Sequence, residues 1–85
     1  MSRIGFERMN NLEIEAFKKS RKWEALYWLS EGYTMTEMAV EMDLTREDTA
    51  NRLHEARVLL GAKDNDELVV RGLILGLLEK RRDLK

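Results

Sequence analysis

The chain contains no cysteine and no proline among its 85 residues. Without cysteine it has no disulfide bond, no thiolate nucleophile and no cysteine ligand for zinc. The lack of cysteine also suits a reducing compartment, and we predict a cytoplasmic protein. Without proline, no residue lacks the backbone N–H that a helix interior needs, so the composition favours uninterrupted helices.

The sequence also lacks a hydrophobic run of membrane-spanning length. Its densest apolar stretch, Leu68 to Leu78, covers eleven residues and is interrupted by Arg71, whereas a spanning helix needs about 20 residues. The first eight residues contain no apolar run of the kind found in signal peptides. We therefore expect a soluble protein that does not associate with a membrane.

Groups that could carry catalysis are scarce. His54 is the one histidine, and no glycine-rich phosphate-binding loop is present. Glu13 and Glu15 lie two residues apart, which on a helix directs them to different faces and does not suit paired acid–base catalysis. The sequence therefore predicts a protein that is not an enzyme and that binds no metal or cofactor.

The residues that are present fit one globular domain, residues 1–85. Apolar residues make up 44% of the chain and charged residues 36%, which is ordinary for a helical protein. The net charge of −1 is unevenly distributed, because residues 31–70 carry four bases and ten acids, a net of −6. Residues 1–30 and 71–85 have net charges of +2 and +3. An acidic middle therefore lies between basic ends.

The spacing of apolar residues predicts an all-α fold of four helices. The first is a long helix from about Leu12 to Ser30, with apolar residues at three- and four-residue steps and a C-terminal stop at Gly32. The fourth runs from about Asp66 to Lys80 after an N-cap at Asp64 or Asn65. The flanking segments are an N-terminal extension, residues 1–11, and a basic tail, residues 81–85.

The two middle helices have well-defined start signals. Thr34 and Glu37 form a capping box before a short helix, and Thr45 is the N-cap of a longer one. A short helix, a tight turn and a longer helix with its own cap is the layout of a helix-turn-helix, which we predict over residues 34–60. The two predicted helices are Met35–Met42 and residues 46–60.

Several motifs resemble the LuxR/GerE-type DNA-binding domains. Residues 31–39, EGYTMTEMA, are similar to the family pattern of glycine, x, serine or threonine, x, x, glutamate, isoleucine, alanine. Residues 44–45 stand where the family has its isoleucine–serine turn, and residues 56–62, ARVLLGA, resemble the end of its recognition helix. The similarity covers residues 21–78 without a gap. Region four of sigma factors is related, and residues 52–57 are similar to it.

The resemblance implies a helix-turn-helix domain whose third helix reads DNA and whose fourth helix, residues 64–80 with its cap, forms dimers. The chain departs from the family pattern at four positions where basic or neutral residues are usual. Thr36, Ala50 and Leu59 stand in place of lysines, and Asp48 in place of a threonine. Each change removes positive charge or adds negative charge.

The candidate DNA-binding residues lie at the starts of the two middle helices and on the outward face of the second. Arg46 could bind guanine with two hydrogen bonds, Asn51 could bind adenine, and Glu47 could accept from cytosine. Threonine hydroxyls at the helix starts could contact phosphates. The predicted set is Thr34, Thr36, Thr45, Arg46, Glu47, Ala50, Asn51, His54 and Arg57.

The alternative is that these residues form an ordinary solvent-facing surface, on a domain that retains the fold but does not bind DNA. The −6 balance of residues 31–70 favours that alternative, because affinity for any duplex comes mainly from neutralised phosphates. Two basic clusters, within residues 18–22 and 80–85, would compensate if folding brought them to the DNA side.

The apolar stretch Leu68–Leu78 predicts a homodimer. A helix that is apolar on nearly every side must be buried on nearly every side, and one short domain can cover only part of it. The alternative is packing against the chain's own first helix and N-terminal segment. The predicted interface residues are Leu68, Val69, Gly72, Leu73, Leu75, Gly76 and Leu78.

Trp23 and Tyr27 form a candidate surface for a protein partner. They lie one helical turn apart, where the resembled family has polar or basic residues, and exposed aromatic pairs often carry binding energy. The alternative is that residues 4–9 fold back and cover them.

Two functions follow as expectations. The first is a homodimeric, DNA-binding regulator of transcription that reads the major groove with residues 46–60. The second is an acidic helix-turn-helix module that binds RNA polymerase, a sigma factor or another transcription regulator without reading DNA.

Overall fold

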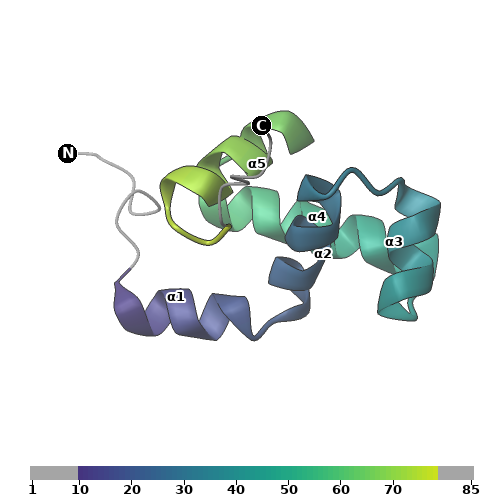
Figure 1. Ribbon diagram of the computed structural model, residues 1–85, viewed down its shortest axis with the longest axis horizontal. Coiled ribbons are helices and arrows are strands. Elements are labelled where there is room, and N and C mark those ends of the chain that lie inside the picture. Colours follow the sequence, from purple (N-terminus) through teal and green to yellow (C-terminus); the bar gives the residue numbers. More distant parts are fainter. Residues whose placement is uncertain (1–9, 79–85) are drawn as a thin grey trace, which may run out of the picture.

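A computed structural model describes residues 10–78 of the chain, and this part is all-helical with no strand. The prediction of an all-α fold is confirmed. The described part contains five helices rather than four (Figure 1). They are α1 Asn11–Lys18, α2 Arg21–Ser30, α3 Met35–Met42, α4 Arg46–Leu60 and α5 Asn65–Ile74.

The predicted long first helix is two helices, which corrects the expectation of one helix from Leu12 to Ser30. Ser20 separates them because its side chain serves both ends. Its hydroxyl donates to the Phe17 carbonyl at 2.7 Å and accepts from the Trp23 N–H at 3.3 Å. The first bond closes the end of α1, and the second caps the start of α2. The chain therefore changes direction without a proline or a glycine.

The last helix is shorter than predicted, since α5 ends at Ile74 and not near Lys80. Gly76 has a φ of +79°, and the N–H groups of Leu77 and Leu78 both donate to the Gly72 carbonyl, at 2.8 and 3.2 Å. This reversal brings both leucines into the core, where they are 2% and 8% exposed. Residues 79 and 80 lie outside the described part, as do residues 1–9 and the basic tail.

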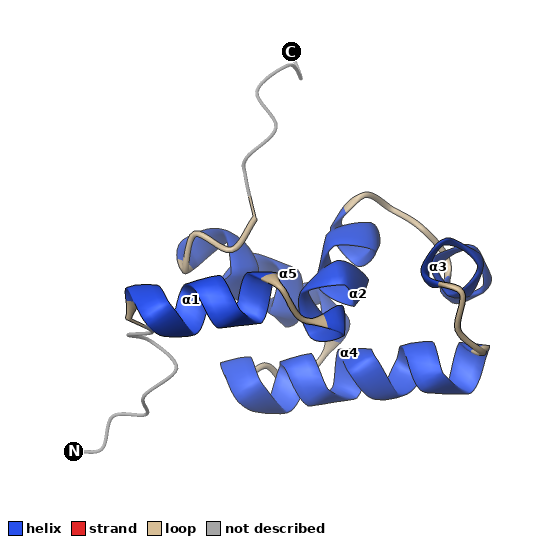
Figure 2. Cartoon of the chain, turned by 90° about the horizontal axis from the view of Figure 1, so that it is seen from below, coloured by secondary structure: helices blue, strands red, loops and turns tan. Residues whose placement is uncertain are grey.

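The core is centred on α2, which contacts all four other helices. Figures 1 and 2 show α4 behind α2, with α1 and α5 toward one end of α4 and α3 at the other. Ala25 and Leu26 of α2 are fully buried. They belong to one buried cluster with residues of the other four helices and of the segment after α5, among them Phe17, Met38, Met42, Leu53, Leu60, Leu68 and Leu77.

Gly72 of α5 and Gly76 just after it, both predicted at a dimer interface, have different surroundings in the single chain. A Cβ at Gly72 would approach Leu78 Cδ1 to 2.9 Å and Leu26 Cδ2 to 3.1 Å, so a larger residue here would require both leucine side chains to shift. A Cβ at Gly76 would meet nothing within 4 Å. Gly76 is therefore required for its left-handed backbone and not for close approach.

Substitution of Gly76 by alanine should destabilise the fold through the backbone alone. The left-handed conformation costs an L-residue about 1–2 kcal/mol, and no steric clash adds to it. We expect Gly76→Ala to lower the urea midpoint accordingly, and Gly76→Asn to lower it less because asparagine tolerates this conformation. An unchanged midpoint in the alanine variant would contradict the observed turn.

The turn before α5 is held by Glu67, whose carboxylate accepts from the Lys63 backbone N–H at 2.8 Å and contacts Arg71 at 3.3 Å. The Lys63 hydrogen bond, followed by the charge of Arg71, lowers the pKa of Glu67 below its usual 4.5. A depressed pKa stabilises the fold above the unfolded pKa, and that contribution is lost as the pH falls through the folded value.

We therefore expect Glu67→Gln to lower the urea midpoint at neutral pH. In acid the variant and the wild type should converge, since the protonated carboxyl no longer differs in charge from the amide. Midpoints measured from pH 7 down to pH 3 check this. A difference in urea midpoint between wild type and variant that stays constant across this pH range would show that the charge of Glu67 is not its cause.

Candidate nucleic-acid interface

The unit formed by α3, a three-residue turn and α4 has the predicted bounds. At its start Thr34 and Glu37 make the predicted capping box, with N···O distances of 2.9 and 3.2 Å. Asp43 adopts the left-handed conformation, with φ of 58°, and this ends α3. Thr45 Oγ1 then accepts from the Asp48 N–H at 2.9 Å and starts α4. Local side-chain chemistry thus fixes both ends of the turn.

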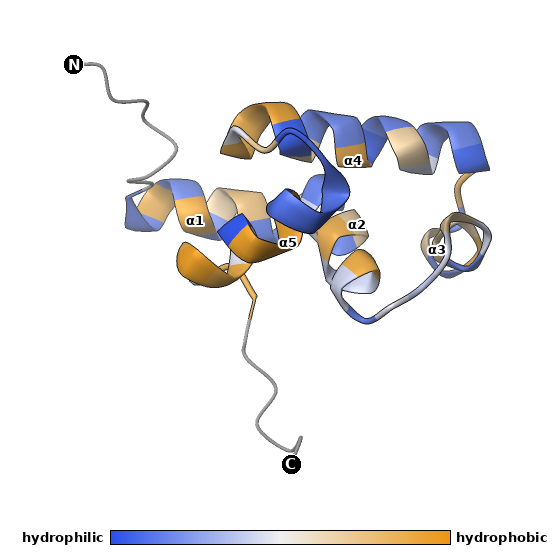
Figure 3. Cartoon of the chain, turned by 90° about the horizontal axis from the view of Figure 1, so that it is seen from above, coloured by the Kyte–Doolittle hydropathy of each residue, from blue (hydrophilic) through white to orange (hydrophobic). Residues whose placement is uncertain are grey.

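The inward face of α4 is the one that the sequence predicts. Thr49, Leu53, Ala56 and Leu60 are all fully buried, at spacings of four, three and four residues. Thr49 is the buried polar side chain of this face, and its hydroxyl donates to the Thr45 carbonyl at 2.8 Å, so burial leaves no unpaired group. Because this face packs on the core, the opposite face of α4 is open to solvent. Figure 3 shows it as hydrophilic over most of its length.

Most of the predicted DNA-binding residues are exposed to solvent in this unit. Eight of the nine are exposed, and Arg57 is half-buried. The hydroxyls of Thr34 and Thr45 already accept helix-capping bonds, but each retains its own hydrogen for an outside acceptor. The exposed members are Thr34, Thr36, Thr45, Arg46, Glu47, Ala50, Asn51 and His54.

Arg57 differs from the other predicted residues because it has a partner within the chain. Its guanidinium donates to Asn65 Oδ1 at 2.5 Å, which joins the end of α4 to the start of α5. Arg52 is also engaged, with two hydrogen bonds of 2.9 Å to the Glu55 carboxylate. Within the described part, Arg46 is thus the cation of α4 that has no hydrogen bond or ion pair of its own.

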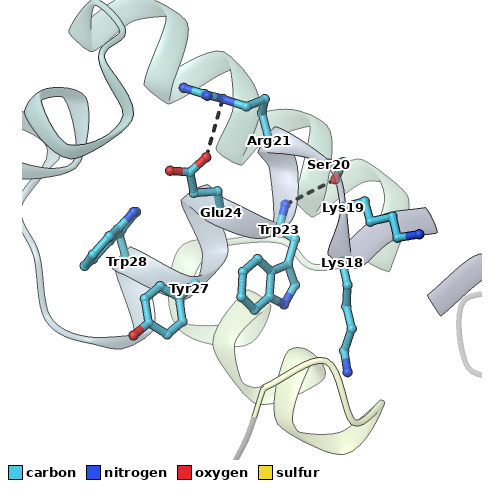
Figure 4. Close-up of a pocket in the computed structure, with 8 residues that line it drawn as sticks. All are labelled: Lys18, Lys19, Ser20, Arg21, Trp23, Glu24, Tyr27 and Trp28. Atoms are coloured by element: carbon cyan, nitrogen blue, oxygen red, sulfur yellow. Dashed lines mark hydrogen bonds and ion pairs between the residues drawn. The ribbon is translucent and has the colours of Figure 1, made fainter. Parts of the chain in front are cut away.

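Lys18 and Lys19 of the first basic cluster do not join this surface. Lys18, Lys19 and Arg21 line a hollow on the outer side of α2 (Figure 4). Since helix residues advance by about 100° each, that side is opposite Ala25 and Leu26, which face the core. The open face of α4 therefore gains no positive charge from Lys18 and Lys19. The second cluster, within residues 80–85, lies outside the described part.

The predicted dimer interface divides between the core and the surface. Three of its seven residues, Leu68, Gly72 and Leu78, are buried in the chain's own core, which corrects their assignment to an interface. Val69 and Leu75 are half-buried and pack against that core. Leu73, at 40%, and Gly76 are exposed.

Two exposed residues of α5 were missing from that prediction. Val70 and Ile74 are 51% and 74% exposed, and with Leu73 they form one stripe at three- and four-residue spacing. The spacing itself could have identified them, because Leu68 and Gly72 mark the inward face and these three positions fall opposite it.

Trp23 and Tyr27, predicted as a partner surface, are half-buried and stacked, with ring centroids 5.4 Å apart. Trp23 also packs against the core, and its Nε1 donates to the Leu77 carbonyl at 2.8 Å. The alternative that residues 4–9 cover this pair concerns residues outside the described part.

No group of three or more potential metal ligands occurs among residues 10–78. None of the helices in this part of the chain has the length and apolar character needed to cross a membrane. No protein-family model, curated protein or solved structure matches the chain.

Proposed function

We propose that the protein is a DNA-binding regulator of transcription in which α3, the turn and α4 act as a helix-turn-helix. The observation that carries this proposal is the set of exposed polar side chains of α4, whose other side is buried in the core. Arg46 is exposed in the first turn of the helix, and Asn51 and His54 are exposed on the face opposite the core. A rigid helix with a polar outer face is what insertion into the major groove requires.

The chemistry of that face suits the reading of bases. Arg46 can donate two hydrogen bonds to guanine, and Asn51 can pair with the edge of adenine. Five residues on a helix span roughly 7.5 Å, about two base-pair steps of 3.4 Å. The two side chains can therefore reach bases about two base-pair steps apart. Glu47, one position after Arg46, can accept from the amino group of a cytosine.

Charge limits how tightly one copy of the domain holds any duplex. Glu47 and Asp48 lie beside Arg46, and Arg52 is paired with Glu55. Few phosphates can then be neutralised, and affinity for DNA of arbitrary sequence should be low. Two copies that bind two half-sites would restore affinity, with half-site centres about 34 Å apart.

The second copy is proposed to bind through the outer stripe of α5. Val70, Leu73 and Ile74 are large apolar side chains that the chain's own core leaves exposed. Figure 3 shows α5 as mainly hydrophobic after its first turn, in contrast to α4. Burial of this stripe against the same stripe of a second copy would form a two-fold interface.

For the DNA contact, we expect the full-length protein to enrich particular duplexes from a random library at low salt. Arg46→Ala should weaken binding to an enriched duplex by about tenfold to a hundredfold, because a bidentate contact is worth about 1–3 kcal/mol. Fluorescence anisotropy with a labelled duplex measures this, and Asn51→Ala should relax the preference at one base pair.

Lys19→Ala is the matched control for Arg46→Ala, because it removes one exposed positive charge from another surface. It should change the affinity little. Equal losses in the two variants would mean that only net charge matters, and full affinity in Arg46→Ala would remove the assignment of this residue to base reading.

For the dimer, we expect Ile74→Glu to give monomers where the wild type gives dimers, because a carboxylate within an apolar stripe would be buried without a partner. Val40→Glu is the control, since Val40 of α3 is 73% exposed and Ile74 is 74% exposed. Sedimentation equilibrium over a range of concentrations distinguishes the states. A monomeric wild type at high concentration would exclude the dimer.

A second function is favoured by the acidic character of the same unit. Glu37, Glu41, Asp43, Glu47 and Asp48 are all exposed on α3, the turn and the start of α4. Such a surface suits a basic protein partner such as RNA polymerase, a sigma factor or another transcription regulator. Failure to enrich any duplex at low salt, with direct binding of purified RNA polymerase or sigma factor, would establish this function in place of DNA reading.

A further inference from the structure

The outer side of α2 carries a hollow of about 360 Å³ that neither function uses. Its residues follow one side of the helix from Ser20 to Trp28, with Lys18 and Lys19 from the end of α1 at its rim (Figure 4). The volume is within the range of about 300–1,000 Å³ found for sites that hold organic ligands. An open hollow of this size fits one or two large apolar side chains.

Aromatic rings form a continuous row along this hollow and beyond it. Trp23 stacks on Tyr27 at 5.4 Å, Tyr27 meets Trp28 edge-on at 5.0 Å, and Trp28 packs on Tyr33 at 4.6 Å. The hydrogen bond from Trp23 Nε1 to the Leu77 carbonyl fixes the first ring. Rings held in place before binding lose little conformational freedom on binding, and tryptophan and tyrosine are enriched among the residues that dominate interfaces.

The charge around the rings is positive. Arg21 is occupied, because it contacts Glu24 at 3.5 Å and donates to the Met42 carbonyl. Lys18 and Lys19 have no hydrogen bond or ion pair in the described part of the chain. The hollow therefore offers two available ammonium groups beside an apolar wall, and this pattern complements a ligand that is both acidic and apolar.

One polar atom of the wall lacks an acceptor. Trp28 Nε1 is buried and makes no hydrogen bond within the described residues. A buried N–H without a partner destabilises the free protein. A ligand in the hollow would relieve this by supplying an acceptor once the Trp28 ring turned to expose Nε1 to it. A backbone carbonyl or carboxylate of a bound peptide is such an acceptor.

We propose that this hollow is a docking site for an acidic, apolar peptide segment of a partner protein. A large apolar side chain of the segment would pack against the row of rings, and neighbouring carboxylates would pair with Lys18 and Lys19. Binding of this segment is compatible with either function above, because the hollow and the open face of α4 lie on opposite sides of the α2–α4 pair. The proposal does not depend on DNA binding.

A single-stranded nucleic acid fits this site less well. Bases bind such surfaces by stacking on free aromatic faces, but here Trp23 and Tyr27 stack on each other and Trp28 packs on Tyr33. The Glu24 carboxylate also lines the hollow and would repel a phosphate backbone. A peptide with separated carboxylates avoids both conflicts.

The test is selection of random 12-residue peptides displayed on phage against the immobilised full chain, followed by synthesis of an enriched peptide as the probe. We expect enrichment of peptides that combine aspartate or glutamate with phenylalanine, leucine or tryptophan. Charge reversal by Lys19→Glu should weaken binding of the labelled probe by at least tenfold. Arg46→Glu, the same reversal on α4, should leave it unchanged.

A second readout uses the indole N–H signals of Trp23 and Trp28, which are the two tryptophans of the sequence. In ¹H–¹⁵N spectra the Trp28 signal should move strongly when the probe is added, because this N–H gains an acceptor. The Trp23 signal should move less, because its hydrogen bond to Leu77 is already made. The two signals are assigned with Trp23→Phe and Trp28→Phe.

Three results would overturn the proposal: no enriched peptide class, equal loss of binding in Lys19→Glu and Arg46→Glu, or an unmoved Trp28 signal at saturating probe. Tighter binding of a labelled oligothymidine than of the peptide, with the same dependence on Lys19, would assign the hollow to nucleic acid instead. Because Arg46→Ala tests the duplex contact separately, failure of one experiment does not decide the other.

Discussion

The burial of one side of α2 is the constraint on which the rest of the structure depends. Ala25 and Leu26 are fully buried, and α2 contacts every other helix of the described part. A short chain has little apolar surface to bury, so each of the other helices must pack closely against α2. Gly72 is small for that reason, and the turn at Gly76 returns Leu77 and Leu78 to the same core. The position of α4 follows from its packing on α2.

This arrangement gives the domain two unlike surfaces. The inward residues of α4 are buried in the core, and its arginine, asparagine and histidine side chains remain exposed to solvent. The outer side of α2 is aromatic and basic because Trp23, Tyr27 and Trp28 fall opposite Ala25 and Leu26. Helical periodicity alone sets this separation. Two partners of different chemistry could thus occupy the domain together.

The sequence predicts best those parts of the fold that short-range chemistry controls. The bounds of α3 and α4, both caps and the inward face of α4 are as predicted, because threonine caps and four-three-four spacing act within a few residues. The division at Ser20 and the end of α5 are not. At Ser20 an apolar period continues across a helix break, and at Gly76 the glycine lies inside an apolar run. Both helix ends are made by short-range bonds that the apolar spacing does not reveal, from Ser20 to Phe17 and Trp23 and from Leu77 and Leu78 to Gly72. Contacts between residues far apart in sequence, such as Trp23 with Leu77, then hold the resulting arrangement.

Charge decides how the candidate DNA surface would have to work. Lys18 and Lys19 lie on the α2 side, Arg52 is paired with Glu55, and Arg57 is bonded to Asn65. Arg46 then acts beside two carboxylates, and one copy has few means to hold a phosphate backbone. Recognition of DNA would therefore depend on contacts with bases and on the pairing of two domains. Affinity that phosphate contacts do not supply must come from binding to a second half-site. If the proposed function holds, the exposed stripe Val70, Leu73 and Ile74 would thus be a requirement for DNA binding and not an accessory to it.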